Sequence, residues 1–185
     1  MGLSREEKMV VFDQELWPHR DAVYNFSFSL TTNEADADDL LQETMQKAFR
    51  FIESYQQGTN PKAWLFRICK NNFINDYRKR RSRGITIDIE EQKDFNDSAL
   101  LIVDMREEIF RNIMHDEVQD AVNSLPVDFR AVLLLCDVED FSYEEMSKIL
   151  DIPIGTVRSR LHRARKMLQE RLKEYASNLG YTVKK

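Results

Sequence analysis

The sequence predicts an all-α protein of two small helical domains joined by a flexible acidic linker, the second a helix-turn-helix domain. Only five Gly and four Pro occur among 185 residues, so few positions would interrupt a helix. Apolar residues recur at helical spacing in most segments, whereas one polar, acidic segment lacks that pattern. We therefore expect a first domain over residues 1–83, a linker over 84–116 and a second domain over 117–185.

The composition indicates a packed protein of a reducing compartment. Hydrophobic residues make up 42% of the chain, which is enough for packed cores. Cys69 and Cys136 lie far apart among apolar residues, without a C-x-x-C pair, and we expect buried free thiols. No apolar run reaches the length of a membrane span, and the N-terminus lacks a signal-peptide core. We expect a cytoplasmic protein with no membrane insertion.

Although the chain has a net charge of −5, it contains two basic patches. Residues 67–83 contain seven Lys or Arg and one acid, and residues 152–173 contain seven Lys or Arg and one acid. Between them, residues 83–116 contain four basic and nine acidic residues. Two separated basic patches predict a bipartite contact with nucleic acid.

Residues 6–32 are predicted to be helical, with a boundary near Pro18, and to serve as core and support. After a polar break that supplies cap residues, a helix is predicted over residues 34–55. Its first turns contain five acids in ten residues, more than the helix dipole requires. A basic protein partner and a merely solvated acidic face are equally compatible with this excess. The apolar stripe of this helix is Leu40, Leu41, Met45, Ala48, Phe49 and Ile52.

Residues 56–61 form a loop by composition, and a helix is predicted over residues 62–83. In this helix aromatic, amide and cationic side chains alternate with apolar ones, which suits unstacked bases: rings stack on bases, amides contact their edges and cations hold phosphates. The alternative is a core helix with a basic tail, and for Trp64 alone we favour burial. The aromatic, amide and cationic residues that surround the apolar side chains of this helix are Trp64, Arg67, Lys70, Asn71, Asn72, Asn75, Arg78 and Lys79.

The linker is predicted to be extended or disordered, although helical signal resumes over residues 99–114. An apolar stripe then runs from Val118 to Leu125 and ends at Pro126, and a further helix is predicted over residues 129–136.

Residues 140–166 predict a helix-turn-helix. Ser142 and Glu145 form an S-x-x-E capping box, so a helix should begin at Tyr143, and Pro153 should end it. A second helix is predicted from about Gly155. Its buried seam is Val157, Leu161, Ala164 and Leu168, and its opposite arc is Arg158, Ser159, His162, Arg163 and Lys166. Such a cationic arc suits the major groove of DNA, and a helical hairpin with a solvated basic face is the alternative.

These motifs together resemble a bacterial RNA polymerase sigma factor of the extracytoplasmic-function (ECF) group, in the sigma-70 family. The similarity extends over nearly the whole chain, in the family's order and spacing. Three stretches show it: DLLQE at 39–43 followed by Ala48-Phe49; AWLFRI at 63–68 with Asn71 and Asp76-Tyr77; and Leu125-Pro126 with Arg130, SYEE at 142–145, GTVRSR at 155–160 and RAR at 163–165.

The resemblance implies a transcription initiation factor that directs core polymerase to specific promoters. It implies contact with the β′ clamp and β subunits of polymerase by Asp36, Asp39, Leu40, Gln42, Glu43 and Gln46. It implies contact with melted −10 DNA by Asn60, Lys62, Trp64, Arg67, Lys70, Asn71, Asn75, Arg78 and Lys79. It implies contact with −35 duplex DNA by Ser142, Tyr143, Thr156, Arg158, Ser159, His162, Arg163 and Lys166. An anti-sigma factor is a further expected partner.

Departures from the family pattern are few. Asp140 stands where many relatives have Gly, and Asp tolerates a left-handed turn. No Cys/His set has zinc-ligand spacing and the three histidines are scattered, so we expect no metal, no cofactor and no enzymatic activity. The alternative function is a self-sufficient helix-turn-helix repressor or activator, which would leave the acidic helix unexplained.

Overall fold

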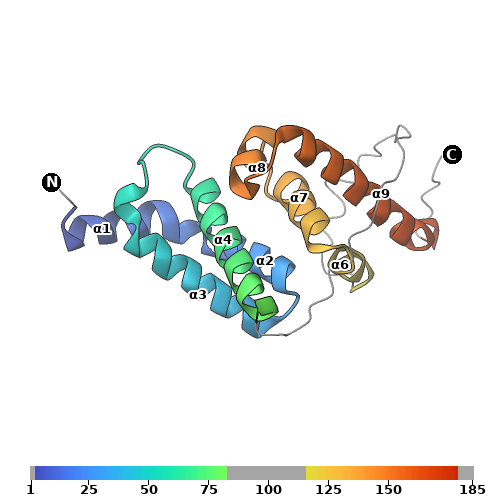
Figure 1. The fold of residues 1–185 in the computed structure, drawn as a ribbon, viewed down its shortest axis with the longest axis horizontal. Coiled ribbons are helices and arrows are strands. Elements are labelled where there is room, and N and C mark those ends of the chain that lie inside the picture. The colour runs from blue at the N-terminus through green and yellow to red at the C-terminus, as the bar shows by residue number, and fades with distance from the viewer. Residues whose placement is uncertain (1–2, 83–115, 179–185) are drawn as a thin grey trace. The chain divides into compact units, whose positions relative to one another are not determined.

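The computed structural model describes residues 3–82 and 116–178, and every regular element in these ranges is a helix. The all-α prediction is confirmed. The predicted linker, and the helical signal at 99–114, lie outside the described residues. The elements, in chain order (Figure 1), are α1 Arg5–Val11, the π-helical turn η1 Phe12–Leu16, the 3-10 turn η2 Trp17–His19, α2 Arg20–Thr31, α3 Glu34–Arg50, the 3-10 turn η3 Ile52–Ser54, α4 Pro61–Ser82, α6 Asp116–Asn123, α7 Val127–Asp137, α8 Tyr143–Leu150 and α9 Ile154–Asn178.

The described helices divide into two compact units, one with α1–α4 and α8, the other with α6, α7 and α9. In the described part of the chain, no helix combines the length and apolar character that a membrane span requires.

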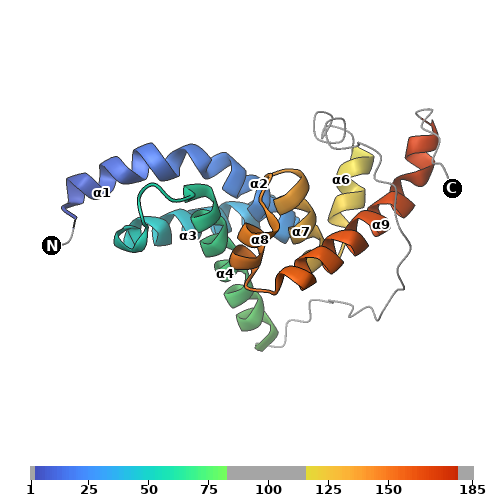
Figure 2. The same cartoon turned by 90° about the horizontal axis from the view of Figure 1, so that it is seen from above.

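In the N-terminal helices, α2 packs against α3, and α3 packs against α4 (Figure 2). The predicted boundary near Pro18 appears as the change from η1 through η2 to α2. Large side chains fill the space between the helices, and the stacked rings of Phe26 and Phe66 have centroids 4.7 Å apart. The predicted polar break is also present: Thr32 is left-handed at φ 56°, and the Asn33 side chain accepts a hydrogen bond from the Asp36 amide at 3.0 Å.

The helix predicted over residues 34–55 is shorter in the structure. It ends at Arg50, Phe51 leaves the helical region, and η3 follows. This tighter turn brings both Ile52 and Tyr55 into the core, where they are 1% and 6% exposed. The thiol of Cys69 also lies in this core, 3.3 Å from Ser27 Oγ, and its burial raises the pKa to about 11. Cys69 and Cys136 are both buried and free, as predicted.

In the second unit, α7 is tied to α6 and to α9 by arginine side chains. The buried Arg130 donates to the backbone carbonyls of Asn123 and Leu125, at the end of α6. Burial lowers the pKa of Arg130 to about 10. Those carbonyls lack partners within their own helix, so the guanidinium acts as a C-terminal cap. On the other side, Asp137 pairs with Arg165 of α9, and Asp128 pairs with Arg160 at 3.0 Å.

The capping box that begins α8 is present: the Glu145 amide donates to Ser142 Oγ, and Glu145 accepts from the Ser142 amide at 2.9 Å. That amide bond is the main cause of the lowered pKa of Glu145. The helix ends at Leu150. The next residue, Asp151, is left-handed at φ 57°, and the Ile152 amide donates to the Ser147 carbonyl at 3.2 Å. The stop therefore depends on Asp151 as well as on Pro153.

Helix α9 begins at Ile154, one residue before the predicted start, and its predicted seam is buried. Leu172 extends the seam by one more turn, and the helix continues to Asn178. Asp140, the expected left-handed position, has φ 55°.

The left-handed Asp151 generates a stability prediction. Substituting Asp151→Ala should lower the free energy of unfolding by about 1 kcal/mol, because a Cβ in this region approaches the following carbonyl and Ala lacks the compensating polar side chain. Asp151→Gly should change it by less than about 0.5 kcal/mol, since Gly adopts φ above 0° without that penalty. Urea unfolding of the full chain measures both. Equal effects of the two substitutions would contradict the argument.

Candidate functional sites

The first candidate site is the acidic face of α3, defined here as Asp36, Asp39, Gln42, Glu43 and Gln46. It points outward because the opposite side of α3 is buried, from Ala37 to Ala48. The side chains of Asp39, Gln42 and Gln46 are exposed, while those of Asp36 and Glu43 are half-buried.

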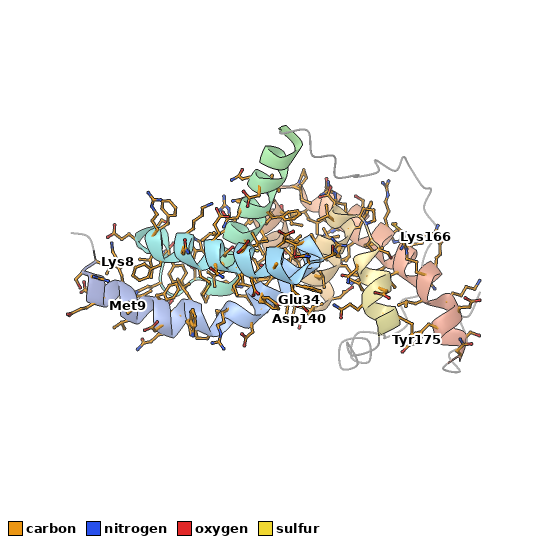
Figure 3. All side chains as sticks on the ribbon, turned by 90° about the horizontal axis from the view of Figure 1, so that it is seen from below. Lys8, Met9, Glu34, Asp140, Lys166 and Tyr175 are labelled. Carbon is orange, nitrogen blue, oxygen red and sulfur yellow. The ribbon has the colours of Figure 1, made fainter. Side chains whose placement is uncertain are left out.

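Leu40 differs from the other residues proposed on this helix, since it is 5% exposed and packs in the core. Glu43 is engaged within the helix, where its carboxylate receives Lys47 Nζ at 2.6 Å. The face therefore offers carboxylate and amide groups, with no large apolar side chain among them, to a partner of basic character. Figure 3 marks Glu34, which begins α3.

The second candidate site is the loop before α4 together with the outer side of that helix. Residues 56–60 are exposed, and Gly58 at φ 80° makes the turn that other residues rarely adopt. Tyr55 Oη lies 2.7 Å from Glu15 Oε2 and 3.3 Å from the Thr59 carbonyl, which fixes the base of the loop. Burial and the bond to Glu15 raise the pKa of Tyr55 to about 12. The loop therefore has an exposed tip on a fixed base.

Asn60 has a structural role in addition to the one predicted, because its side chain accepts from the Ala63 amide at 3.0 Å and caps α4. Trp64, for which we favoured burial, is half-buried, and its ring packs on Tyr55 at 5.2 Å between centroids. Along the rest of α4, Arg67, Asn71 and Asn75 are exposed. Lys62 and Lys70 are half-buried, and the side chains of Arg78 and Lys79 lie outside the described part.

The placement of Asn72 among the outward residues of this helix was wrong. Asn72 is 3% exposed and accepts a hydrogen bond from Lys47 Nζ at 2.6 Å. Its position follows Leu65 by seven residues and Cys69 by three, which is the spacing of the buried seam. That periodicity could have identified it, whereas its residue type suggested the surface.

The third candidate site is the basic arc of α9, defined as Arg158, Ser159, His162, Arg163 and Lys166. Arg158 and Ser159 are exposed and the other three are half-buried, as is Thr156. The Ser159 hydroxyl donates to the Thr156 carbonyl at 3.1 Å. Figure 3 marks Lys166 on this helix.

The remaining predicted residues precede α9 in the chain: Ser142 is exposed and Tyr143 half-buried, and Ser142 serves as the cap of α8. The structure also separates two kinds of arginine on α9. Arg160 and Arg165 pair with acids of α7 and stabilise the fold, whereas Arg158 and Arg163 lie on the basic arc.

Two protein-family models match this chain. The Sigma-70 region 2 model matches residues 18–83, which contain the first two candidate sites, and the Sigma-70, region 4 model matches residues 115–168, which contain α6 to α8 and most of α9. The chain is 38% identical over 176 residues to the ECF RNA polymerase sigma factor SigE of Mycolicibacterium smegmatis, covering 95% of this chain and 66% of that protein's length.

Two further similarities cover most of both partners. The chain is 38% identical to the ECF RNA polymerase sigma factor EcfG of Rhodopseudomonas palustris, over 77% of this chain and 75% of the relative. Among solved structures, the sigma factor RpoE in complex with the anti-sigma factor NepR from Bartonella quintana aligns with a TM-score of 0.67 and 35% identity, over 88% of this chain and 96% of that one.

The region 2 and region 4 models both match this chain, with region 2 first. The matched residues include α3, α4 and most of α9, the helices that carry the candidate sites. Relatives above 30% identity cover most of the chain's length. The chain belongs to the ECF sigma factors of the sigma-70 family, which are transcription initiation factors and not enzymes.

Proposed function

We propose that this sigma factor binds core RNA polymerase through the acidic face of α3 and directs it to promoters that it recognises at two places. The basic arc of α9 contacts −35 duplex DNA, and the outer side of α4, with its preceding loop, holds unpaired bases of the −10 segment. The observation that carries the proposal is that three helices of one chain bury their apolar sides and present three different polar surfaces.

The chemistry of each surface suits its proposed partner. The acidic face of α3 suits a basic protein surface, because complementary charge favours association and orientation. The side chains of α4 combine exposed amides at Asn71 and Asn75 with cationic groups and a half-buried ring at Trp64. Such groups stabilise bases that have left the stack, which offsets an unstacking cost of a few kcal/mol per step.

We also propose an anti-sigma factor as a partner, since a structurally similar sigma factor has been solved in complex with one. Both described cysteines are buried thiols, which suits the reducing cytoplasm where polymerase acts. The experiment that tests the function is transcription from a promoter library with purified core polymerase and this chain. Products that start at defined sites are expected, and tight promoter binding by the chain alone would favour the self-sufficient regulator instead.

The acidic face generates a prediction about assembly. Asp39→Arg should weaken binding to core polymerase at least tenfold, because the reversed charge faces a basic partner. Affinity is measured by titrating labelled chain with core polymerase. The matched control is Glu174→Arg, which makes the same charge change at an exposed position of α9. If both variants assemble like the wild type with normal helicity, the acidic face is not the anchor.

The basic arc generates a prediction about base preference. Arg158→Ala should relax the preference at one or two −35 base pairs, because a forked guanidinium contact to guanine contributes about 1–3 kcal/mol of discrimination. Lys166→Ala should weaken all sequences alike and reduce the slope of log affinity against log salt by about one unit.

Binding of the holoenzyme to single-base −35 variants at two salt concentrations distinguishes these effects. Arg165→Ala serves as the control, because that side chain pairs with Asp137 and should affect stability without changing base preference. A uniform loss for both Arg158→Ala and Lys166→Ala would exclude direct base contacts by Arg158 and leave DNA shape as the source of specificity.

A further inference from the structure

A continuous set of hydrogen bonds runs from the acidic face of α3 to the buried side of α4. Lys47 Nζ donates to Glu43 Oε1 and to Asn72 Oδ1, both at 2.6 Å. The Asn72 amide nitrogen donates to Thr44 Oγ1 at 3.3 Å, and Thr44 donates to the Leu40 carbonyl at 2.7 Å. Lys47 therefore contacts one residue of the proposed polymerase surface and one residue of the proposed −10 helix.

The two ends of this set differ in their contact with solvent. The side chains of Glu43 and Lys47 are each 37% exposed, whereas Asn72 is 3% exposed and Thr44 is fully buried. A buried amide cannot exchange its partners for water, so the bonds to Lys47 and Thr44 restrict the rotation of Asn72. The ammonium of Lys47, in contrast, is partly in contact with solvent, where a charge that arrives beside Glu43 acts on it directly.

Asn72 is adjacent to Asn71 and three residues before Asn75, the exposed amides proposed to hold bases. Residues of one helix turn together, so the bond that holds Asn72 against α3 also sets the direction of Asn71 and Asn75. A change at Lys47 can therefore reach the base-holding side of α4 without any contact between Lys47 and DNA.

We propose that Lys47 and Asn72 are positioning residues that couple polymerase binding at Glu43 to the capture of unpaired −10 bases by α4. This inference rests on the proposed function. A cationic group of polymerase at Glu43 repels the Lys47 ammonium and competes with it for the carboxylate. The Lys47 ammonium then keeps its hydrogen bond to Asn72 while the one to Glu43 weakens. The bond to Asn72 holds α4 more firmly in the orientation that binds bases. By thermodynamic linkage, captured DNA strengthens polymerase binding by the same factor.

The experiment measures this factor directly. The probe is the single-stranded non-template −10 segment of a promoter that the wild-type holoenzyme transcribes. The dissociation constant of labelled full-length chain for core polymerase is measured with and without saturating probe, and the ratio of the two values is the coupling factor. For the wild type we expect a factor of about 5 to 150, the usual range for linked sites.

Lys47→Met should reduce the coupling factor at least about threefold, because the thioether cannot bridge Glu43 and Asn72. Lys47→Arg should retain most of it, because its guanidinium still donates. Lys8→Met is the matched control: Lys8 pairs with Glu53 at 2.8 Å, and its loss removes a Lys–Glu pair of the same kind on other elements. Asn72→Leu should behave like Lys47→Met, because leucine can neither accept from Lys47 nor donate to Thr44.

Each outcome has one meaning. A coupling factor in Lys47→Met equal to that of the wild type overturns the proposal, even if Asn72→Leu fails to fold. A loss of polymerase affinity in Lys47→Met that is equal with and without probe also overturns it, because Lys47 would then contact polymerase without transmitting anything to α4. If the wild-type chain neither binds core polymerase nor supports transcription, the proposed function itself fails, and the variants play no part in that result.

Discussion

The packing of α3 against α4 is the constraint on which the N-terminal surfaces depend. Leu40 and Thr44 on one helix, and Leu65 and Cys69 on the other, are almost entirely removed from solvent. Rotating either helix would expose this apolar surface, at about 25 cal/mol per Å², and would bury charged groups such as Asp39. The directions of the acidic face and of the exposed amides of α4 are therefore set together, by one shared core.

In the C-terminal helices, buried and paired charged side chains help to fix the orientation of the helices. Arg130 is held inside the fold by carbonyls at the end of α6, so its charge stabilises a helix end and is not available to a ligand. Arg160 and Arg165 pair with acids of α7, and these pairs help to fix the orientation of α9. A count of the positive charges on α9 would overestimate the DNA-binding surface, because two of its arginines are structural.

The sequence predicted those features that depend on local chemistry. The start of α8 at Tyr143 followed from a capping box, and the seam of α9 from helical periodicity. The left-handed Asp140 was expected only from the family resemblance, since many relatives have Gly at that position. Features that depend on tertiary packing were missed. Residue type alone made Asn72 an outward residue, although its partners, Lys47 and Thr44, lie on a different helix. The early end of α3 at Arg50 and the role of Tyr55 at the base of the loop also depend on contacts between distant segments.

In the proposed function, the two DNA-contacting surfaces act as parts of one polymerase-bound factor. The most direct test compares promoter binding by the chain alone, by core polymerase alone and by both together, on duplex DNA from a promoter that supports transcription. We expect sequence-specific binding and strand opening, detected by permanganate reactivity of unpaired thymines, only when chain and polymerase are both present. Equally tight and specific binding by the chain alone, unchanged when polymerase is added, would contradict the proposed function.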